Sequence, residues 1–252
     1  MSGPTGTRDD DRSAAPLRTR GNEPTLQAAL DRLAGGCGLL VTGDVSTEAY
    51  RVAAARYFGE SSNDRRRVLG LTHDSLRADD WLPDGVDSDG DDADVVRLGD
   101  AVRDPAAVEP DPADPPVDDG RQPVTDPETF SDRFLGAIRA DDGEPTDSMY
   151  LRVGLYRVDG LRAALGEDRA GDLLCDAAAA TRDRGGMAHF HLPRPAAETS
   201  APRADPVVDS VATRLGEHLD VIVQLRFAER AAVPEERWHI LGWGTTDWHP
   251  LR

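Results

Sequence analysis

The chain contains no lysine: its 29 basic residues other than histidine are all arginine. This absence excludes chemistry that needs a lysine amine, including Schiff bases and the phosphate contact of a P-loop lysine. The cations are also outnumbered, since 47 Asp and Glu residues give the 252-residue chain a formal net charge of -18. We therefore expect no nucleic-acid partner, because binding through a broad basic surface needs clustered cations.

This composition is typical of a halophilic, cytosolic protein. Dense carboxylates keep a protein hydrated in molar salt, where the Debye length is only about 3 Å. An acidic protein encoded by GC-rich DNA, which favours Arg over Lys, is the alternative interpretation.

Long apolar runs and cysteine are scarce as well. No apolar run approaches the roughly 18 residues of a membrane span, and the N-terminus lacks an apolar signal core. We therefore expect a cytoplasmic protein without a membrane partner. The two cysteines, Cys37 and Cys175, match no zinc or redox spacing, which predicts buried, inert thiols.

The composition changes along the chain and predicts its organisation. Residues 1–22 have almost no large apolar side chains, which predicts a disordered acidic and polar tail before one domain over 24–252. Inserts rich in Pro, Gly and Asp, at about 83–94 and 101–127, predict solvated loops in that domain. The first insert does not match a calcium loop, because Asp92 stands at the sixth position, where that motif needs glycine.

Strand and helix patterns alternate through the domain. We expect strands within 37–43, 66–74, 94–100, 150–159, 187–192, 220–229 and 237–244. Helices are expected within 26–33, 48–58, 129–140, 161–184 (with a break near Gly166) and 205–219. This alternation predicts a parallel sheet with helices on both faces. The last two strands are joined too tightly for a crossover and must be antiparallel.

Three segments carry a family resemblance. They are "LLVTGDVSTEAYRVA" from Leu39, the stretch from Tyr150 to Pro193 with a strand ending at Asp159, and the C-terminal "LDVIVQLRF" followed by "RWHILGW". Their order resembles the RecA/KaiC-like P-loop ATPase family, and in particular its uncharacterised, degenerate members in halophilic archaea. The resemblance implies a three-layer α/β RecA-like domain, with a mostly parallel sheet and a C-terminal antiparallel hairpin.

The same resemblance implies a vestigial nucleotide-binding region. It places the P-loop at the segment that contains five residues of interest, namely Gly38, Gly43, Asp44, Ser46 and Thr47. It also implies that Asp159 closes the Walker B strand.

The P-loop motif itself is degenerate. A working P-loop reads G-x-x-x-x-G-K-[ST], and its lysine reaches the β- and γ-phosphates. Gly38 and Gly43 keep the glycine spacing, but Asp44 and Val45 follow where Lys and Ser/Thr belong. A register that starts at Gly43 instead places Glu48 and Ala49 near those positions, so either register puts a carboxylate near a bound triphosphate.

We therefore interpret the chain as a pseudo-ATPase without catalytic residues or cofactor. It is expected to be a regulatory or protein-interaction module that binds a protein partner or itself. The alternative is a divergent ATPase that binds Mg·ATP with an arginine in place of the lysine, either Arg51 or one from a neighbouring subunit.

Two histidines and the C-terminal aromatic residues leave further interpretations open. His189 and His191 lie on one face of a strand, either as structural histidines or as metal ligands with His73, Asp74 or Asp159; we expect no metal. The C-terminal segment concentrates tryptophan and histidine, which favours either packing of the hairpin or an interaction surface. The candidate surface residues are Trp243, Trp248 and His249.

Overall fold

The computed structural model describes residues 26–61, 65–73, 77–99, 123–140, 151–194, 201–228 and 233–251. The expected N-terminal tail and most of the second acidic insert lie outside these ranges. The first insert is described: residues 83–92 form turns and irregular chain before a strand that begins at Ala93.

One sheet organises the described residues. Its strands are β1 (Cys37–Gly43), β2 (Arg67–Leu71), β3 (Ala93–Arg97), β4 (Arg152–Tyr156), β5 (Met187–Pro193), β6 (Val221–Arg226), β7 (Glu235–Ile240), β8 (Gly244–Thr245) and β9 (His249–Pro250). They are arranged in the order β3-β2-β4-β5-β1-β6-β7-β8, and β9 also pairs with β7. The strands from β3 to β6 in this order are parallel, and β7 is antiparallel to β6.

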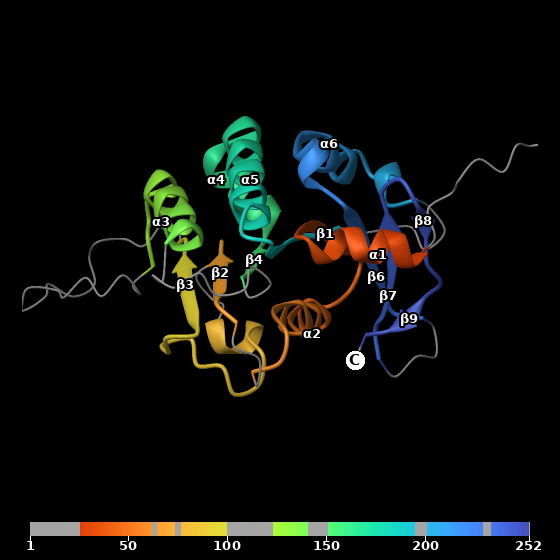
Figure 1. Ribbon diagram of the computed structural model, residues 1–252. Coiled ribbons are helices and arrows are strands. Elements are labelled where there is room, and N and C mark those ends of the chain that lie inside the picture. Colours follow the sequence, from red (N-terminus) through yellow and green to blue (C-terminus); the bar gives the residue numbers. More distant parts are fainter. Residues whose placement is uncertain are drawn as a thin grey trace, which may run out of the picture.

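Helices cover both faces of this sheet (Figure 1). They are α1 (Leu26–Ala34), α2 (Thr47–Phe58), α3 (Pro127–Arg139), α4 (Val158–Leu165), α5 (Glu167–Arg182) and α6 (Pro206–Leu215), with short 3-10 helices η1 (Ala78–Trp81), η3 (Pro202–Ala204) and η4 (Gly216–His218). Helices α3, α4, α5 and α6 lie on one face, and α2 lies on the other. The expected three-layer, mostly parallel α/β architecture with an antiparallel C-terminal hairpin is confirmed.

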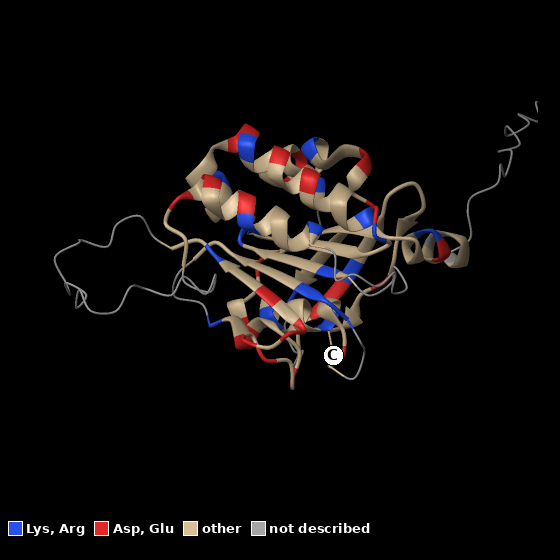
Figure 2. Cartoon of the chain, turned by 60° about the vertical axis from the view of Figure 1, so that its left-hand side comes forward, with Lys and Arg blue, Asp and Glu red and all other residues tan. Residues whose placement is uncertain are grey.

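The sheet separates two apolar cores. All seven residues of β1 are buried, and they alternate between the faces: Leu40 belongs to the core that α3, α5 and α6 cover, whereas Leu39 and Val41 belong to the core that α2 covers. A central parallel strand needs this continuous apolar run because helices cover it on both sides. Figure 2 shows acidic and basic residues interspersed on the outer helices, away from these cores.

Local signals in the sequence explain several element boundaries. The carboxylate of Asp126 caps α3 by accepting the backbone N–H of Thr129 at 2.8 Å. Phe130, Phe134 and Ile138 then lie at helical spacing, and all three are fully buried. The expected break near Gly166 is confirmed, since this glycine has a φ of 83° and separates α4 from α5.

One expected boundary is wrong. Strand β4 ends at Tyr156, and Asp159 lies in the first turn of α4. The apolar alternation of the strand stops at Arg157, whose polar side chain pairs with the helical carboxylate instead of continuing the buried strand.

Candidate functional site

The carboxyl ends of the parallel strands meet at one edge of the sheet. Ligands of open α/β sheets usually bind at this edge. A nucleotide would therefore bind near the connection that follows β1 and the residues that follow β4.

The connection between β1 and α2 is short. Strand β1 ends at Gly43 and α2 begins at Thr47, so only Asp44, Val45 and Ser46 lie between them. Ser46 occupies the N-cap position without a side-chain capping hydrogen bond, and the side chains of Asp44, Ser46 and Thr47 are exposed. Ser46 thus takes the N-cap position of α2 but leaves its hydroxyl unused as a cap.

The two glycines with P-loop spacing are both explained by backbone packing. Gly38 lies inside β1, where a Cβ atom would stand 2.1 Å from the carbonyl oxygen of His218. At Gly43, which has a φ of 155°, a Cβ atom would stand 2.2 Å from the carbonyl oxygen of Leu225. Each glycine therefore permits a close approach of β1 to the chain around β6.

An aromatic cluster lies beneath this connection. Tyr50 is fully buried, and its hydroxyl donates to the carbonyl of Gly43 at 2.8 Å. Its ring centroid lies 5.9 Å from that of Tyr156 and 5.8 Å from that of His191. Trp81 closes the cluster, with its ring centroid 3.9 Å from that of Tyr156. We name Tyr50, Trp81, Tyr156 and His191 the edge cluster; burial raises the pKa of Tyr50 well above its ordinary value.

The acid at the expected Walker B position has a cationic partner. Asp159 accepts two hydrogen bonds from Arg157, Nε to Oδ1 at 3.1 Å and Nη2 to Oδ2 at 2.5 Å. Hydrogen bonding to Asp159 also raises the pKa of Arg157. Thr72 holds the backbone here, because its hydroxyl donates to the carbonyl of Arg157 and accepts the N–H of the same residue. These residues line a pocket of about 520 Å³, together with His73.

The buried histidine pair occupies the α2 face of β5. His189 and His191 are fully buried, and Nδ1 of the first lies 2.8 Å from Nε2 of the second. Burial lowers the pKa of His191 to about 3 and that of His189 well below its ordinary value. Their placement on one face is confirmed, and His73 lies on the surface. Within the described ranges, no three His, Cys, Asp or Glu side chains gather closely enough to bind a metal ion.

The two cysteines differ in exposure. Cys37 is buried, and burial raises the pKa of its thiol to about 12, as expected for an inert thiol. Cys175 is only partly buried, and its sulfur donates to the carbonyl of Arg214 at 3.3 Å. The expectation of burial is therefore confirmed for Cys37 and met in part for Cys175, because helix α5 places the latter at the rim of its core.

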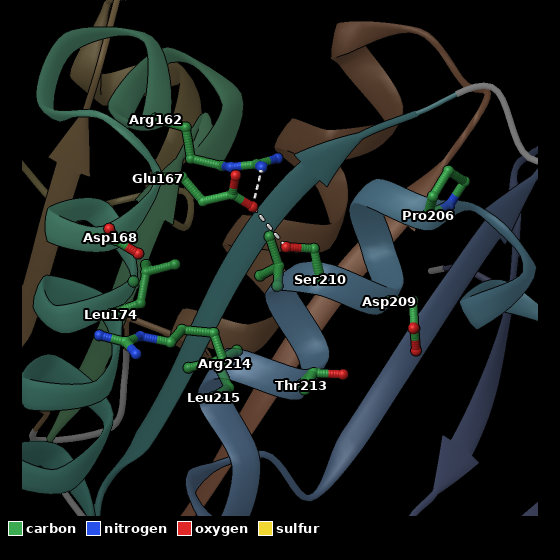
Figure 3. A pocket seen from close by; sticks show the side chains of 12 residues that line it. Arg162, Glu167, Asp168, Leu174, Pro206, Asp209, Ser210, Thr213, Arg214 and Leu215 are labelled. Carbon is green, nitrogen blue, oxygen red and sulfur yellow. Dashed lines mark hydrogen bonds and ion pairs between the residues drawn. The ribbon is translucent and has the colours of Figure 1, made fainter.

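A second pocket, of about 590 Å³, lies between helices rather than at the sheet edge. Figure 3 shows Glu167 of α5 between Arg162 of α4 and Ser210 of α6, and both partners are 2.6 Å from its Oε1 atom. This pocket has an apolar floor that includes Leu174 and Leu215. Four of its charged residues, Arg162, Glu167, Asp209 and Arg214, have ion-pair partners, so the pocket serves as a junction between three helices.

The C-terminal residues divide between core and surface. Trp238 and Trp243 pack against the core under α2, whereas His249 is exposed on β9. Trp248 lies against two guanidinium groups, with the Cζ atoms of Arg226 and Arg237 at 4.0 Å and 4.5 Å from its ring centroid. Neither arginine was predicted as a site residue, although Gln224 and Arg226 on one strand and Arg237 and His239 on the next show the two-residue period of one polar sheet face.

The chain was compared with known families, proteins and structures. The model of a family of unknown function, DUF7504, matches residues 36–225, which run from the start of β1 into β6. Among solved structures, the chain is similar to a KaiC-like protein, PH0186, from the hyperthermophilic archaeon Pyrococcus horikoshii OT3. That match has a TM-score of 0.49 and 12% sequence identity and covers 85% of each chain. No curated protein matches the chain. Among the helices that the structure describes, none combines the length and apolar character needed to cross a membrane.

Proposed function

Because the chain belongs to the DUF7504 family, whose function is unknown, we propose a function from its own residues: a RecA/KaiC-like domain that has lost nucleotide binding and acts by binding another protein. The observation that carries this proposal is the three-residue connection between β1 and α2. A P-loop holds phosphates with the backbone N–H groups of a long glycine-rich loop. A P-loop motif counted from Gly43 would run into α2, which begins at Thr47. The second half of that motif is therefore helix and not loop.

The charges around this connection support the proposal. Asp44 follows β1 directly, and Glu48 lies in the first turn of α2. Two like charges 4 Å apart repel each other by about 4 kcal/mol at an effective dielectric constant of about 20. A triphosphate near these carboxylates would meet such repulsion with no lysine to offset it.

The edge cluster supports it further. The hydroxyl of Tyr50 bonds to the last carbonyl of β1, and its ring packs against Tyr156 at the end of β4. This packing ties the turn to the sheet. A loop that wraps around phosphates needs its backbone N–H groups free to turn toward the ligand.

The position of Arg51 does not favour the alternative ATPase. Its Nη1 atom lies 3.3 Å from Glu48 and its Nη2 atom lies 3.1 Å from Asp80 of η1. These contacts hold Arg51 between α2 and η1, where it lines an open pocket with Asp79 and Asp80. Turning it toward a phosphate would break both ion pairs.

The test is a calorimetric titration of Mg·ATP into the purified protein in about 2–3 M KCl, where an acidic surface no longer repels itself. Circular dichroism first verifies the fold under these conditions. We expect no saturable heat up to millimolar ATP. Saturable heat in the micromolar range overturns the proposal, and its loss in the Arg51→Gln variant then identifies the arginine-substituted ATPase.

A further inference from the structure

One sheet face near the C-terminus carries a cluster of polar and cationic side chains, of which Gln224 is buried and the others are half-buried. Gln224 and Arg226 of β6 lie on the same face as Arg237 and His239 of β7, since Gln224 and Arg237 are register partners. The intervening residues Val223 and Leu225 point into the opposite core. Trp248, from the segment between β8 and β9, lies over this face.

Arg237 is held in place without a counter-charge. Its Nη2 atom donates to Oε1 of Gln224 at 2.6 Å, and its guanidinium lies against the ring of Trp248. Its Nε atom is buried and makes no hydrogen bond. In the part of the chain that the structure describes, no carboxylate lies within ion-pair distance of Arg237.

A second cation adds to this imbalance. Arg226 lies against the same indole ring, and its Nε and Nη2 atoms both reach one oxygen, Oε2, of Glu235 at 2.9 Å. Glu235 is thus the partner of Arg226 alone, and the two guanidinium groups beside Trp248 have one carboxylate partner between them. Burial and the neighbouring Arg226 lower the pKa of Arg237. Both effects disfavour the charged form of this guanidinium in the free protein.

We propose that Arg226, Arg237 and Trp248 form a docking site for a carboxylate side chain on an acidic peptide segment of a partner protein. The evidence is charge complementarity: in a chain whose net charge is -18, Glu235 pairs with Arg226, and Arg237 has no carboxylate partner among the described residues. A planar guanidinium pairs with a carboxylate in a bidentate manner, and Gln224 and the indole already fix the orientation of Arg237. Trp and Arg are also the residues that contribute most at protein interfaces.

A carboxylate suits this site better than a phosphate. The anchoring groups are two side-chain forks and an indole, and the segment that bears Trp248 lies at the C-terminal end of the sheet, where β8 and β9 each contribute two residues. Polyphosphates and nucleic acids carry many charges and are repelled by the rest of this acidic surface. A short acidic segment needs only one or two pairs, and its methylene groups can pack on the indole.

This inference rests on the proposed function as a protein-binding module, but the two can fail separately. A protein that binds both Mg·ATP and an acidic peptide would overturn only the loss of nucleotide binding. A protein that binds neither would overturn only the docking site.

The test follows the indole N–H signals of the full chain by NMR, after labelling its four tryptophans with ¹⁵N. The signal of Trp248 is assigned with the Trp248→Phe variant. The probes are the peptide acetyl-Gly-Asp-Glu-Asp-Gly-amide and its uncharged analogue, in which Asn and Gln replace the acids. We expect a saturable shift of the Trp248 signal with the acidic peptide and none with the analogue.

The variants locate the site. Arg237→Gln and, separately, Arg226→Gln should each weaken binding of the acidic peptide at least about tenfold. Arg203→Gln is the matched control, because Arg203 is exposed, pairs with Asp209 of α6 and belongs to neither β6, β7 nor the segment of Trp248. Equal binding of the two peptides, or unchanged binding in both Arg237→Gln and Arg226→Gln, would overturn the proposal. A larger shift with inorganic phosphate than with the acidic peptide would also overturn it.

Discussion

The substitution Gly38→Ala separates a packing role of the glycine spacing from a phosphate-binding role. Gly38 lies within β1, and the Cβ atom of an alanine would stand 2.1 Å from the carbonyl oxygen of His218. That oxygen belongs to the backbone, so no side chain can rotate away. Two hydrogen bonds also join this point to Asp220, whose carboxylate accepts the N–H of Gly38 and whose own N–H reaches the carbonyl, both at 2.9 Å.

The expected magnitude follows from these contacts. Overpacking of a well-packed core costs about 1–3 kcal/mol, and we expect the upper part of that range because backbone must move. For a domain of this size, each kcal/mol corresponds to about 2–4 °C in Tm. The free energy of unfolding, measured by urea titration at fixed salt with circular dichroism, should therefore fall by about 2–3 kcal/mol.

A matched variant controls for the change from glycine to alanine itself. Gly136 lies inside α3, and no atom stands within 4 Å of a Cβ added there. Gly136→Ala should leave the stability unchanged or raise it by up to about 1 kcal/mol. If Gly38→Ala changed the free energy of unfolding by less than about 0.5 kcal/mol, the packing explanation of this glycine would be refuted.

Three further predictions concern single side chains. Asp205→Ala should cost about 1 kcal/mol, because this residue caps α6 by accepting two backbone N–H groups. Those hydrogen bonds outweigh desolvation and lower the pKa of Asp205. The difference in unfolding free energy between Asp205→Ala and the parent, measured by urea titration, should therefore shrink as the pH falls below about 4. The stability of the parent should also decrease from pH 6.5 to pH 5, by up to about 1.4 kcal/mol per pH unit for each of His189 and His191, because only the unfolded chain binds these protons. The His191→Gln variant should show a shallower slope of unfolding free energy against pH, and an unchanged slope would contradict this assignment. Tyr50→Phe should lower the stability by about 1 kcal/mol in thermal unfolding, because the carbonyl of Gly43 loses the hydroxyl donor and keeps only the longer contact from the N–H of Arg194.

Much of the fold was predictable from local patterns. Alternation of apolar strands with amphipathic helices, as in the stripe of Phe130, Phe134 and Ile138, predicted the layers, and a single glycine predicted the break between α4 and α5. The pattern failed at Asp159. An arginine after a strand can continue it or begin a helix, and only the pairing of Arg157 with Asp159 decides between them.

The candidate site was less predictable. The edge cluster joins Tyr50 of α2, Trp81 of η1, Tyr156 of β4 and His191 of β5, and no spacing along the chain relates these four residues. The same holds for Trp248, which meets Arg226 across a turn and two short strands. Their contacts depend on strand order, because neighbours in the sheet are far apart in the sequence.

The sequence by itself determined the class of fold, the absence of lysine chemistry and the acidic charge, since these depend on local periodicity and on composition. Only the tertiary structure decided that Gly38 and Gly43 accommodate neighbouring backbone, and that Arg237 stands beside an indole without a carboxylate partner in the described chain. A glycine motif has the same letters whether it faces a phosphate or a neighbouring strand. Which of the two it faces is set by the packing of β1 against segments about 180 residues further along the chain.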